Sequence, residues 1–230
     1  MLKIDHLKFG HGPHIVGAED TALGTGIYGV IGPSGSGKST FLNTLAGFHN
    51  CEFGSVIFDG QDLLAQRVED RPIAMLFQSN NLFPHLSIFR NVALGITSRR
   101  WLSNNQRQLV IDALKRVGLS GFENRKPGAL SGGQQSRAAL ARVLLQKKPI
   151  LLLDEPFAAL GPAMRNEMLD LVKEIAEADN QTVLLVTHSP DDALRICDQT
   201  IFVSDGKLWL AGDTKTALQN IPSEMRDYFG

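Results

Sequence analysis

Cysteine is scarce in this chain of 230 residues, occurring only at positions 51 and 197 and without a Cys-x-x-Cys spacing. Such a pair suits a reducing compartment and supplies neither a disulfide framework nor a zinc site. Long apolar runs are also missing, and the longest, 150–153 and 183–186, are far shorter than the ~20 residues that span a bilayer. No apolar signal segment opens the sequence, so we expect a protein that is soluble on its own.

An excess of one charge is absent as well. The sequence holds 23 Lys and Arg against 24 Asp and Glu, for a net charge of -1. Nucleic acid favours a basic partner, so this balance argues against nucleic acid as the main partner. A hydrophobic share of 43% and a charged share of 20% are typical of a globular chain that buries a core.

Short apolar runs alternate with helical patterns along the chain. We expect strands at 27–31, 55–58, 73–77, 150–153, 182–187 and 200–203, and helices at 38–48, 87–94, 105–117 and 131–146, with two more beginning at Pro162 and Pro190. Alternating strands and helices favour an α/β fold with a largely parallel sheet. Three of the helices follow one another in mid-chain, which indicates a helical subdomain of approximately residues 87–147 inserted into the sheet.

The apolar run 27–31 leads into a turn that matches the P-loop pattern and opens a helix. The residues of this turn and the helix start are Gly32, Pro33, Ser34, Gly35, Ser36, Gly37, Lys38, Ser39 and Thr40. Backbone N–H groups of such a loop surround phosphate oxygens, and the positive end of the following helix faces them. Lys38 can reach the β- and γ-phosphates, and the Ser39 hydroxyl suits Mg²⁺. The alternative, a glycine-rich turn that binds nothing, is disfavoured by the flanking strand and helix.

The buried run 150–153 ends in two carboxylates, Asp154 and Glu155. Buried carboxylates without partners are costly, so a metal ion or a positive loop is expected beside them. Asp154 suits Mg²⁺, largely through water, and Glu155 suits orienting or deprotonating an attacking water. A solvated pair at a strand end is the alternative.

A second anion site is indicated where Leu130 is followed by Ser131, Gly132, Gly133 and Gln134. Ser131 and Gln134 have the spacing of a capping box, and the free N–H groups of a helix start attract anions. An ordinary helix cap is the alternative reading.

Together these motifs resemble the nucleotide-binding subunit of ABC transporters. The P-loop, Gln78 at a strand end, the Leu-Ser-Gly-Gly-Gln sequence, the two carboxylates and His188 follow in the family's order over nearly the whole length. The resemblance implies one ABC ATPase domain over 1–230: a P-loop NTPase core, an N-terminal antiparallel β subdomain and the inserted helical subdomain. It also implies a head-to-tail homodimer, in which residues 131–134 of one copy close on the ATP and Mg²⁺ held by the other.

The resemblance further assigns roles to single residues. Gln78 is expected to contact Mg²⁺ and the attacking water, and His188 the γ-phosphate, which makes both catalytic together with Glu155. A polar strand end and a structural histidine are the plain alternatives. An aromatic ring near the start usually stacks on adenine in this family, and Phe9 and His11 both remain candidates.

One position departs from the family pattern. Ala159 and Leu160 are followed by Gly161 where the family usually has Asp. Glycine still serves as a helix cap at a cost of about a few tenths of a kcal/mol. The lost carboxylate puts coupling between the two ATP sites in doubt, while Glu155 leaves the chemistry intact.

The segment 71–86 resembles importer cassettes, and we expect no additional β-domain. The pattern Gln-x-Asn-Asn-Leu-Phe at 78–83 is most similar to the ATPases of thiamine importers, with iron, molybdate and polyamine importers as alternatives. A soluble non-transport ABC ATPase is less favoured, since no second cassette or coiled-coil insert is seen. The implied partners are integral membrane permease subunits and, indirectly, a periplasmic solute-binding protein, with no nucleic acid. The implied location is peripheral, at the cytoplasmic face of the inner membrane.

Overall fold

The computed structural model describes residues 1–12 and 14–225. The strands are β1 (Leu2–His11), β2 (His14–Ala18), β3 (Thr21–Leu23), β4 (Gly26–Ile31), β5 (Cys51–Phe58), β6 (Gln61–Asp62), β7 (Ile73–Leu76), β8 (Ile150–Asp154), β9 (Thr182–Val186), β10 (Gln199–Ser204) and β11 (Lys207–Asp213). The α-helices are α1 (Lys38–Ala46), α2 (Ile88–Ala93), α3 (Asn104–Arg116), α4 (Gly132–Leu144), α5 (Pro162–Ala178), α6 (Pro190–Ile196) and α7 (Thr214–Gln219). Short 3-10 turns lie at Val68–Asp70, Pro127–Ala129 and Ser223–Met225.

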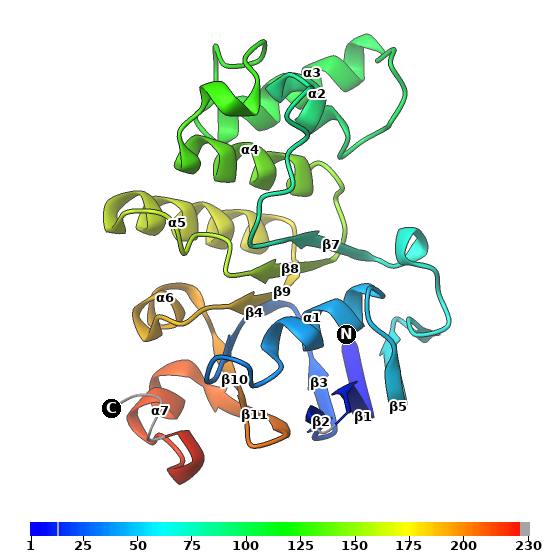
Figure 1. Cartoon of the computed structure of the whole chain (residues 1–230), viewed down its shortest axis with the longest axis vertical. Coiled ribbons are helices and arrows are strands. Elements are labelled where there is room, and N and C mark those ends of the chain that lie inside the picture. Colours follow the sequence, from blue (N-terminus) through cyan, green and yellow to red (C-terminus); the bar gives the residue numbers. More distant parts are fainter. Residues whose placement is uncertain (13, 226–230) are drawn as a thin grey trace.

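The strands of the described residues form one curled sheet with a parallel centre (Figure 1). The parallel strands run in the order β10-β4-β9-β8-β7. Strand β11 returns antiparallel along β10 and leads to β2, and β2, β1, β5 and β6 continue as antiparallel neighbours, with β3 also paired to β1. The expected parallel core and N-terminal antiparallel part are both confirmed.

The central strands are apolar at nearly every position because helices cover both of their faces. In β8, Ile150 and Leu152 pack in the cluster that contains the α1 side chains, whereas Leu151 and Leu153 pack with the α5 side chains. All four are at most 1% exposed. Strands buried on both faces cannot use an alternating pattern, which explains the unbroken apolar run read from the sequence. Each such side chain contributes about 1.5–3 kcal/mol by leaving water.

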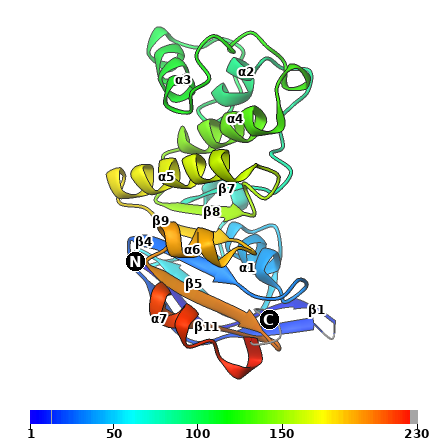
Figure 2. The same cartoon turned by 90° about the vertical axis from the view of Figure 1, so that its left-hand side faces the viewer.

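Residues 87–147, here called the helical lobe, carry α2, α3 and α4 and have a core of their own. Ile88 and Val92 of α2 and Val110 and Leu114 of α3 are fully buried there. Figures 1 and 2 both place this lobe at one end of the molecule, above α5 and the sheet. The apolar face expected for the helix at 105–117 is therefore the face that meets α2 and α4.

The strand expected at 55–58 begins earlier, at Cys51. Its first half pairs with β1 through two register shifts, and Gly54, with φ 101°, lies at the shift between Asp5 and Lys8. A glycine and polar residues concealed this half of the strand, because tertiary pairing rather than local preference places it in the sheet. Cys51 and Cys197 are free thiols. In the described part of the chain, every helix is too short or too polar to cross a bilayer.

The end of α1 is held by a buried arginine from a distant segment. Arg71 is 6% exposed, and its Nη1 donates to the carbonyl oxygens of Thr44, at 2.9 Å, and Leu45, at 2.6 Å. These carbonyls belong to the last turn of α1, where helical donors run out and the Gly47 N–H reaches only the first of them, at 3.2 Å. The contact fixes α1, whose first residue is Lys38, against the segment that leads into β7.

We expect Arg71→Met to destabilise the fold by about 2 kcal/mol, because the Leu45 carbonyl oxygen loses its charged donor and the Thr44 carbonyl oxygen keeps only the Gly47 N–H. The midpoint of thermal unfolding should fall by roughly 4–8 °C for a chain of this size. Arg67→Met is the matched control, since Arg67 pairs only with exposed Glu69 and Asp70, and its midpoint should stay at the wild-type value. Equal midpoints for the two variants would show that Arg71 does not support α1.

Candidate functional site

The candidate site lies at the edge where the parallel strands end. β4, β9, β8 and β7 are in register side by side, so the segments that follow them emerge together. The P-loop follows β4, Glu155 follows β8, His188 lies two residues beyond β9, and Gln78 lies two beyond β7. Ligand sites of open parallel sheets form at this edge.

Two glycines of the P-loop are required by close contacts. A Cβ on Gly32 would lie 2.0 Å from the carbonyl oxygen of Val203. Gly37 has φ 105°, and a Cβ there would lie 2.9 Å from Val16 Cγ2. Any side chain at these positions would push the loop off β10 and β2. The close packing of the loop against β10 and β2 therefore requires glycine at these two positions.

Lys38 places its ammonium group inside the loop. The side chain is 5% exposed, and Nζ donates to the carbonyl oxygens of Gly32 and Pro33 at 2.7 Å each. Burial lowers the pKa of Lys38 from its ordinary value, and the nearby carboxylates of Glu155 and Asp154 partly oppose that shift. Ser36 Oγ is buried and has no hydrogen-bond partner among the described residues. A phosphate oxygen would complete the bonding of this hydroxyl, so the loop fits a phosphate chain.

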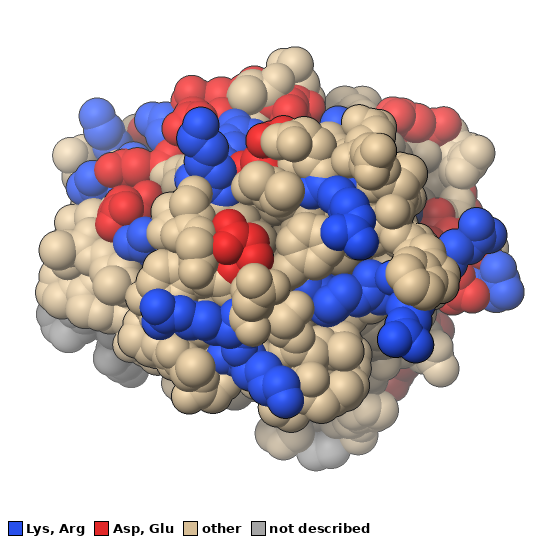
Figure 3. Space-filling model, turned by 90° about the horizontal axis from the view of Figure 1, so that it is seen from above, with Lys and Arg blue, Asp and Glu red and all other residues tan. Residues whose placement is uncertain are grey.

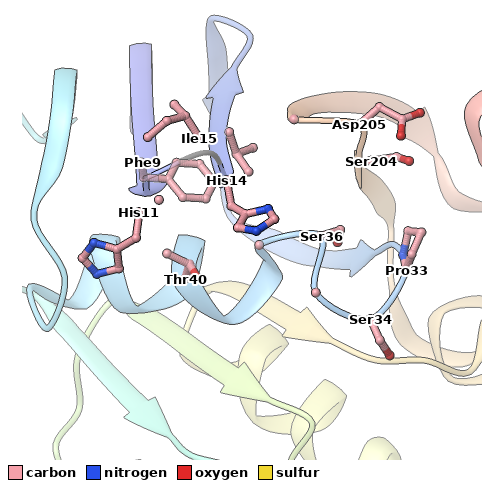
Figure 4. A pocket seen from close by; sticks show the side chains of 15 residues that line it. Phe9, His11, His14, Ile15, Pro33, Ser34, Ser36, Thr40, Ser204 and Asp205 are labelled. Carbon is pink, nitrogen blue, oxygen red and sulfur yellow. The ribbon is translucent and has the colours of Figure 1, made fainter.

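A cavity of about 480 Å³ opens beside the loop, and part of its wall is the β1–β2 segment (Figure 4). The two candidate adenine-stacking residues differ here. Phe9 is fully buried and packs on Phe41 with ring centroids 5.5 Å apart, so it belongs to the core beneath the loop. His11 is exposed at the rim, where its ring meets His49 edge-on at 4.3 Å. Only His11 of the pair has a ring exposed for stacking.

Asp154 and Ser39 form the oxygen pair expected of a magnesium site. Ser39 Oγ donates to Asp154 Oδ1 at 2.9 Å, although 115 residues separate them in sequence. Burial raises the pKa of Asp154 above its ordinary value, with Glu155 adding to this, while the hydrogen bond from Ser39 and the charges of Lys38 and His188 oppose it. A hydroxyl and a partly desolvated carboxylate facing each other suit Mg²⁺, which prefers oxygen ligands.

The three candidate catalytic side chains meet at Glu155. His188 Nε2 contacts Glu155 Oε1, and Gln78 Nε2 approaches Glu155 Oε2 to 3.5 Å. Glu155 has φ 45°, which is rare for a residue with a side chain, and its N–H donates to the Val186 carbonyl at 3.1 Å. A conformation of this kind costs about 1–3 kcal/mol and persists where the surroundings enforce it. The bond to β9 thus holds the carboxylate at the strand edge.

A buried network that the sequence did not reveal supports His188. Asp192 is 7% exposed and accepts hydrogen bonds from Thr187 Oγ1 at 2.7 Å and from Arg165 Nε at 2.9 Å. The Ser189 N–H in turn donates to Thr187 Oγ1 at 3.1 Å. Both neighbours of His188 are therefore tied to α5 and α6. Asp192 lies in the first turn of α6, and no local pattern in the sequence links it to Arg165.

The Leu-Ser-Gly-Gly-Gln segment caps α4 as its spacing predicts. Ser131 Oγ accepts from the Gln134 N–H at 3.3 Å, and Gln134 Oε1 accepts from the Ser131 N–H at 3.0 Å. Gly133 is buried, and a Cβ there would lie 2.0 Å from Met164 Sδ at the start of α5. Figures 1 and 2 show α5 and sheet strands between α4 and α1. None of residues 131–134 lines the cavity beside the chain's own P-loop.

Gly161 is the N-cap of α5, which confirms its expected role as a cap. It has an ordinary φ of -66°, makes no side-chain cap bond, and has open space where a Cβ would stand. Aspartate would fit this position without a clash.

The chain is similar to known proteins over its whole length. The family model described as ABC transporter matches residues 24–158. Over all 230 residues the chain is 51% identical to the thiamine import ATP-binding protein ThiQ of Ruegeria sp. (strain TM1040), covering 100% of both chains. It is 47% identical to the protein of the same name from Cereibacter sphaeroides, again covering 100% of both chains.

Solved structures of similar fold are ABC cassettes. The dimeric post-hydrolysis structure of the ATP-binding cassette MJ0796 with ADP and Pi has a TM-score of 0.78 at 32% identity, covering 90% of this chain and 96% of the other. The cbiO1 protein of Clostridium perfringens, part of the ABC transporter complex cbiONQ, has a TM-score of 0.84 at 28% identity, covering 95% and 90%.

The position of Glu155 predicts that Glu155→Gln lowers the ATP hydrolysis rate at least about 100-fold, since a lost general base costs about 10²–10⁴ in rate. Nucleotide binding should stay within a few-fold of wild type, because Lys38 and the loop are unchanged. Phosphate release and titration with a fluorescent ATP analogue measure the two quantities. Glu177→Gln, on the exposed side of α5, is the matched control and should hydrolyse normally. A normal hydrolysis rate for Glu155→Gln would show that Glu155 does not take part in the reaction.

Proposed function

Because the chain belongs to the ABC transporter family, we propose that it is the ATP-binding and ATP-hydrolysing subunit of a bacterial importer that takes up thiamine. The observation that carries this proposal is the match over the full length of both chains to relatives named for thiamine import. The P-loop, the contact of Ser39 with Asp154 and the contacts of Gln78 and His188 with Glu155 support the same proposal. The role of each residue below is part of the proposal.

The P-loop amides of residues 32–40 hold the phosphate chain of ATP. Lys38 neutralises the β- and γ-phosphates from inside the loop, and Ser36 completes its hydrogen bonding on a phosphate oxygen. His11 stacks on the adenine at the rim of the cavity, while Phe9 supports the loop from the core. Binding thus uses one cavity with a charged end and an aromatic end.

Ser39 and Asp154 would hold Mg²⁺, with Gln78 as a third protein oxygen ligand and phosphate and water oxygens as the others. The ion supplies charge neutralisation for the phosphate oxygens when it is bound. The contact between Ser39 and Asp154 already places the two groups at a common point. Burial of Asp154 favours a divalent cation there, because a desolvated carboxylate gains most from a charged partner.

Glu155 accepts a proton from the attacking water, and Gln78 and His188 hold the water and the γ-phosphate in line. The contacts of both side chains with Glu155 keep the three groups together. Asp192, Arg165 and Thr187 act on this geometry indirectly by fixing the backbone around His188. Little covalent chemistry is asked of the protein, and positioning supplies most of the rate.

A second copy of the chain completes the site. Ser131, Gly132, Gly133 and Gln134 lie too far from their own P-loop, and the exposed start of α4 is suited to a phosphate presented by another molecule. We therefore assign a head-to-tail homodimer in which each ATP lies between the P-loop of one copy and the α4 start of the other. Because Gly161 stands where the family usually has Asp, one carboxylate is missing near that contact.

The chain then acts as one ABC ATPase domain over 1–230, with a helical subdomain of about 87–147. It is a peripheral protein at the cytoplasmic face of the inner membrane. Its partners are the integral membrane permease subunits and, through them, a periplasmic solute-binding protein. The cassette does not touch the cargo, so iron, molybdate or polyamine uptake are the competing readings. The named relatives favour thiamine over these.

The dimer is tested in the hydrolysis-blocked background. We expect Glu155→Gln with ATP to elute as a dimer in size-exclusion chromatography with light scattering, and as a monomer without ATP. Adding Ser131→Glu should keep it monomeric at unchanged ATP affinity, because a carboxylate would face the partner's γ-phosphate. Ser120→Glu, an exposed serine elsewhere on the lobe, is the control and should leave the dimer intact. Dimers that form equally well with Ser131→Glu would contradict the assignment.

The cargo is tested with the chain, its permease and its solute-binding protein in proteoliposomes. We expect ATP-dependent uptake of labelled thiamine that vanishes with Glu155→Gln. Thiamine should also raise the ATPase rate in the presence of the binding protein, whereas ferric iron, molybdate and spermidine should not. If one of those solutes stimulates the ATPase and thiamine does not, that solute is the cargo. The assignment of the chain as an ATPase is unaffected by that result.

A further inference from the structure

The net charge of -1 conceals a strong separation of charge. The helical lobe, residues 87–147, holds 11 Lys and Arg but only two acids, Asp112 and Glu123, for a local charge of +9. The rest of the chain therefore carries -10. Figure 3 views the molecule from the lobe end and shows many blue side chains there with few red ones among them. An asymmetry of this size indicates an anionic partner for the lobe.

A tryptophan stands at the tip of a loop on this lobe. Trp101 is 79% exposed, more than any other large hydrophobic residue in the described part of the chain. Ile96 and Leu102 pack into the lobe's core on either side of the tip. Arg90 donates to the carbonyl oxygens of Arg100, at 3.1 Å, and Arg99, at 3.0 Å, which fixes the loop from behind. The loop is thus anchored at both ends and holds Trp101 outward.

Basic residues occupy the loop of this tryptophan and the exposed face of α3, the helix that follows the loop. The guanidinium carbon of Arg100 lies 5.7 Å from the Trp101 ring centroid. Arg107 and Ile111 are both exposed and lie four residues apart on the same face of α3. We call Arg99, Arg100, Trp101, Arg107 and Ile111 the Trp101 patch. Within residues 1–12 and 14–225, none of its three arginines pairs with a carboxylate.

We infer that the Trp101 patch binds the anionic phospholipid headgroups of the membrane that holds the permease. Tryptophan and arginine are the side chains that membrane interfaces favour: the indole lies at headgroup depth, and the guanidinium groups meet lipid phosphates. Ile111 adds an apolar contact between charged neighbours. The patch would hold the lobe against the membrane independently of the permease. This inference rests on the proposed function only for placing the protein at a membrane.

Charge favours lipid over a protein surface as the occupant. Cytoplasmic loops of membrane proteins carry an excess of Lys and Arg, and such loops would repel this patch. The inner leaflet instead has a negative surface potential that attracts polybasic segments. Nucleic acid shares the anionic chemistry, and the experiment below separates it from lipid.

The test uses the full chain with Trp209→Phe, which leaves Trp101 as the only tryptophan of the two. We expect its emission to shift to shorter wavelength on vesicles of phosphatidylcholine with roughly a third phosphatidylglycerol, but not on phosphatidylcholine alone. The shift should weaken at high salt, because screening acts on exposed charges. Neutralising Arg99 and Arg100 to Gln should weaken binding about 25-fold, since each basic residue near such a surface contributes about fivefold.

The control is Lys207→Gln with Lys215→Gln, which removes the same charge from exposed positions in β11 and α7. It should bind anionic vesicles like wild type. Equal binding to neutral vesicles, an equal loss in the control, or tighter binding to RNA than to anionic vesicles at the same salt would each overturn the lipid assignment. No permease, thiamine or ATP is present, so failure here leaves the proteoliposome uptake test unaffected. If thiamine uptake fails while the protein still binds anionic vesicles, the result contradicts the proposed function and leaves the lipid assignment intact.

Discussion

The parallel pairing of β4, β9, β8 and β7 is the constraint on which the site depends. It brings the P-loop, His188, Glu155 and Gln78 to one edge although they are spread over more than 150 residues of sequence. Helices on both faces exclude water from these strands, so the edge is rigid. That rigidity allows Glu155 to be held in an unfavourable backbone conformation directly beside its partners.

The same architecture separates the P-loop from the start of α4, the two features that we propose bind ATP from different copies of the chain. The P-loop begins α1 beneath the sheet, whereas Ser131 begins α4 in the helical lobe, with α5 between them. Met164 of α5 packs where a side chain on Gly133 would stand, so the start of α4 is fixed to the helix that follows Gly161. A change at the proposed dimer contact would therefore reach α5, and through Arg165 and Asp192 the loop of His188.

Net charge proved a poor guide to surfaces. A value of -1 argued against nucleic acid as the main partner, yet it combines +9 on the lobe with -10 elsewhere. Potentials act over about a Debye length, roughly 8–10 Å, so each surface is governed by its own charges and not by the total. The block of basic residues at 90–126 was visible in the sequence, and counting charge by expected subdomain would have found it.

The sequence by itself determined the central strands and the helices α1 to α6, the P-loop, the paired carboxylates and the capping box at Ser131, because each depends on residues close together along the chain. Only the tertiary structure decided that Phe9 is core and His11 exposed, that Arg71 caps α1, and that Asp192 bonds to Arg165 and Thr187. Burial and long-range hydrogen bonds depend on which elements pack together. Residues 27 positions apart, such as Arg165 and Asp192, carry no local sign of that contact.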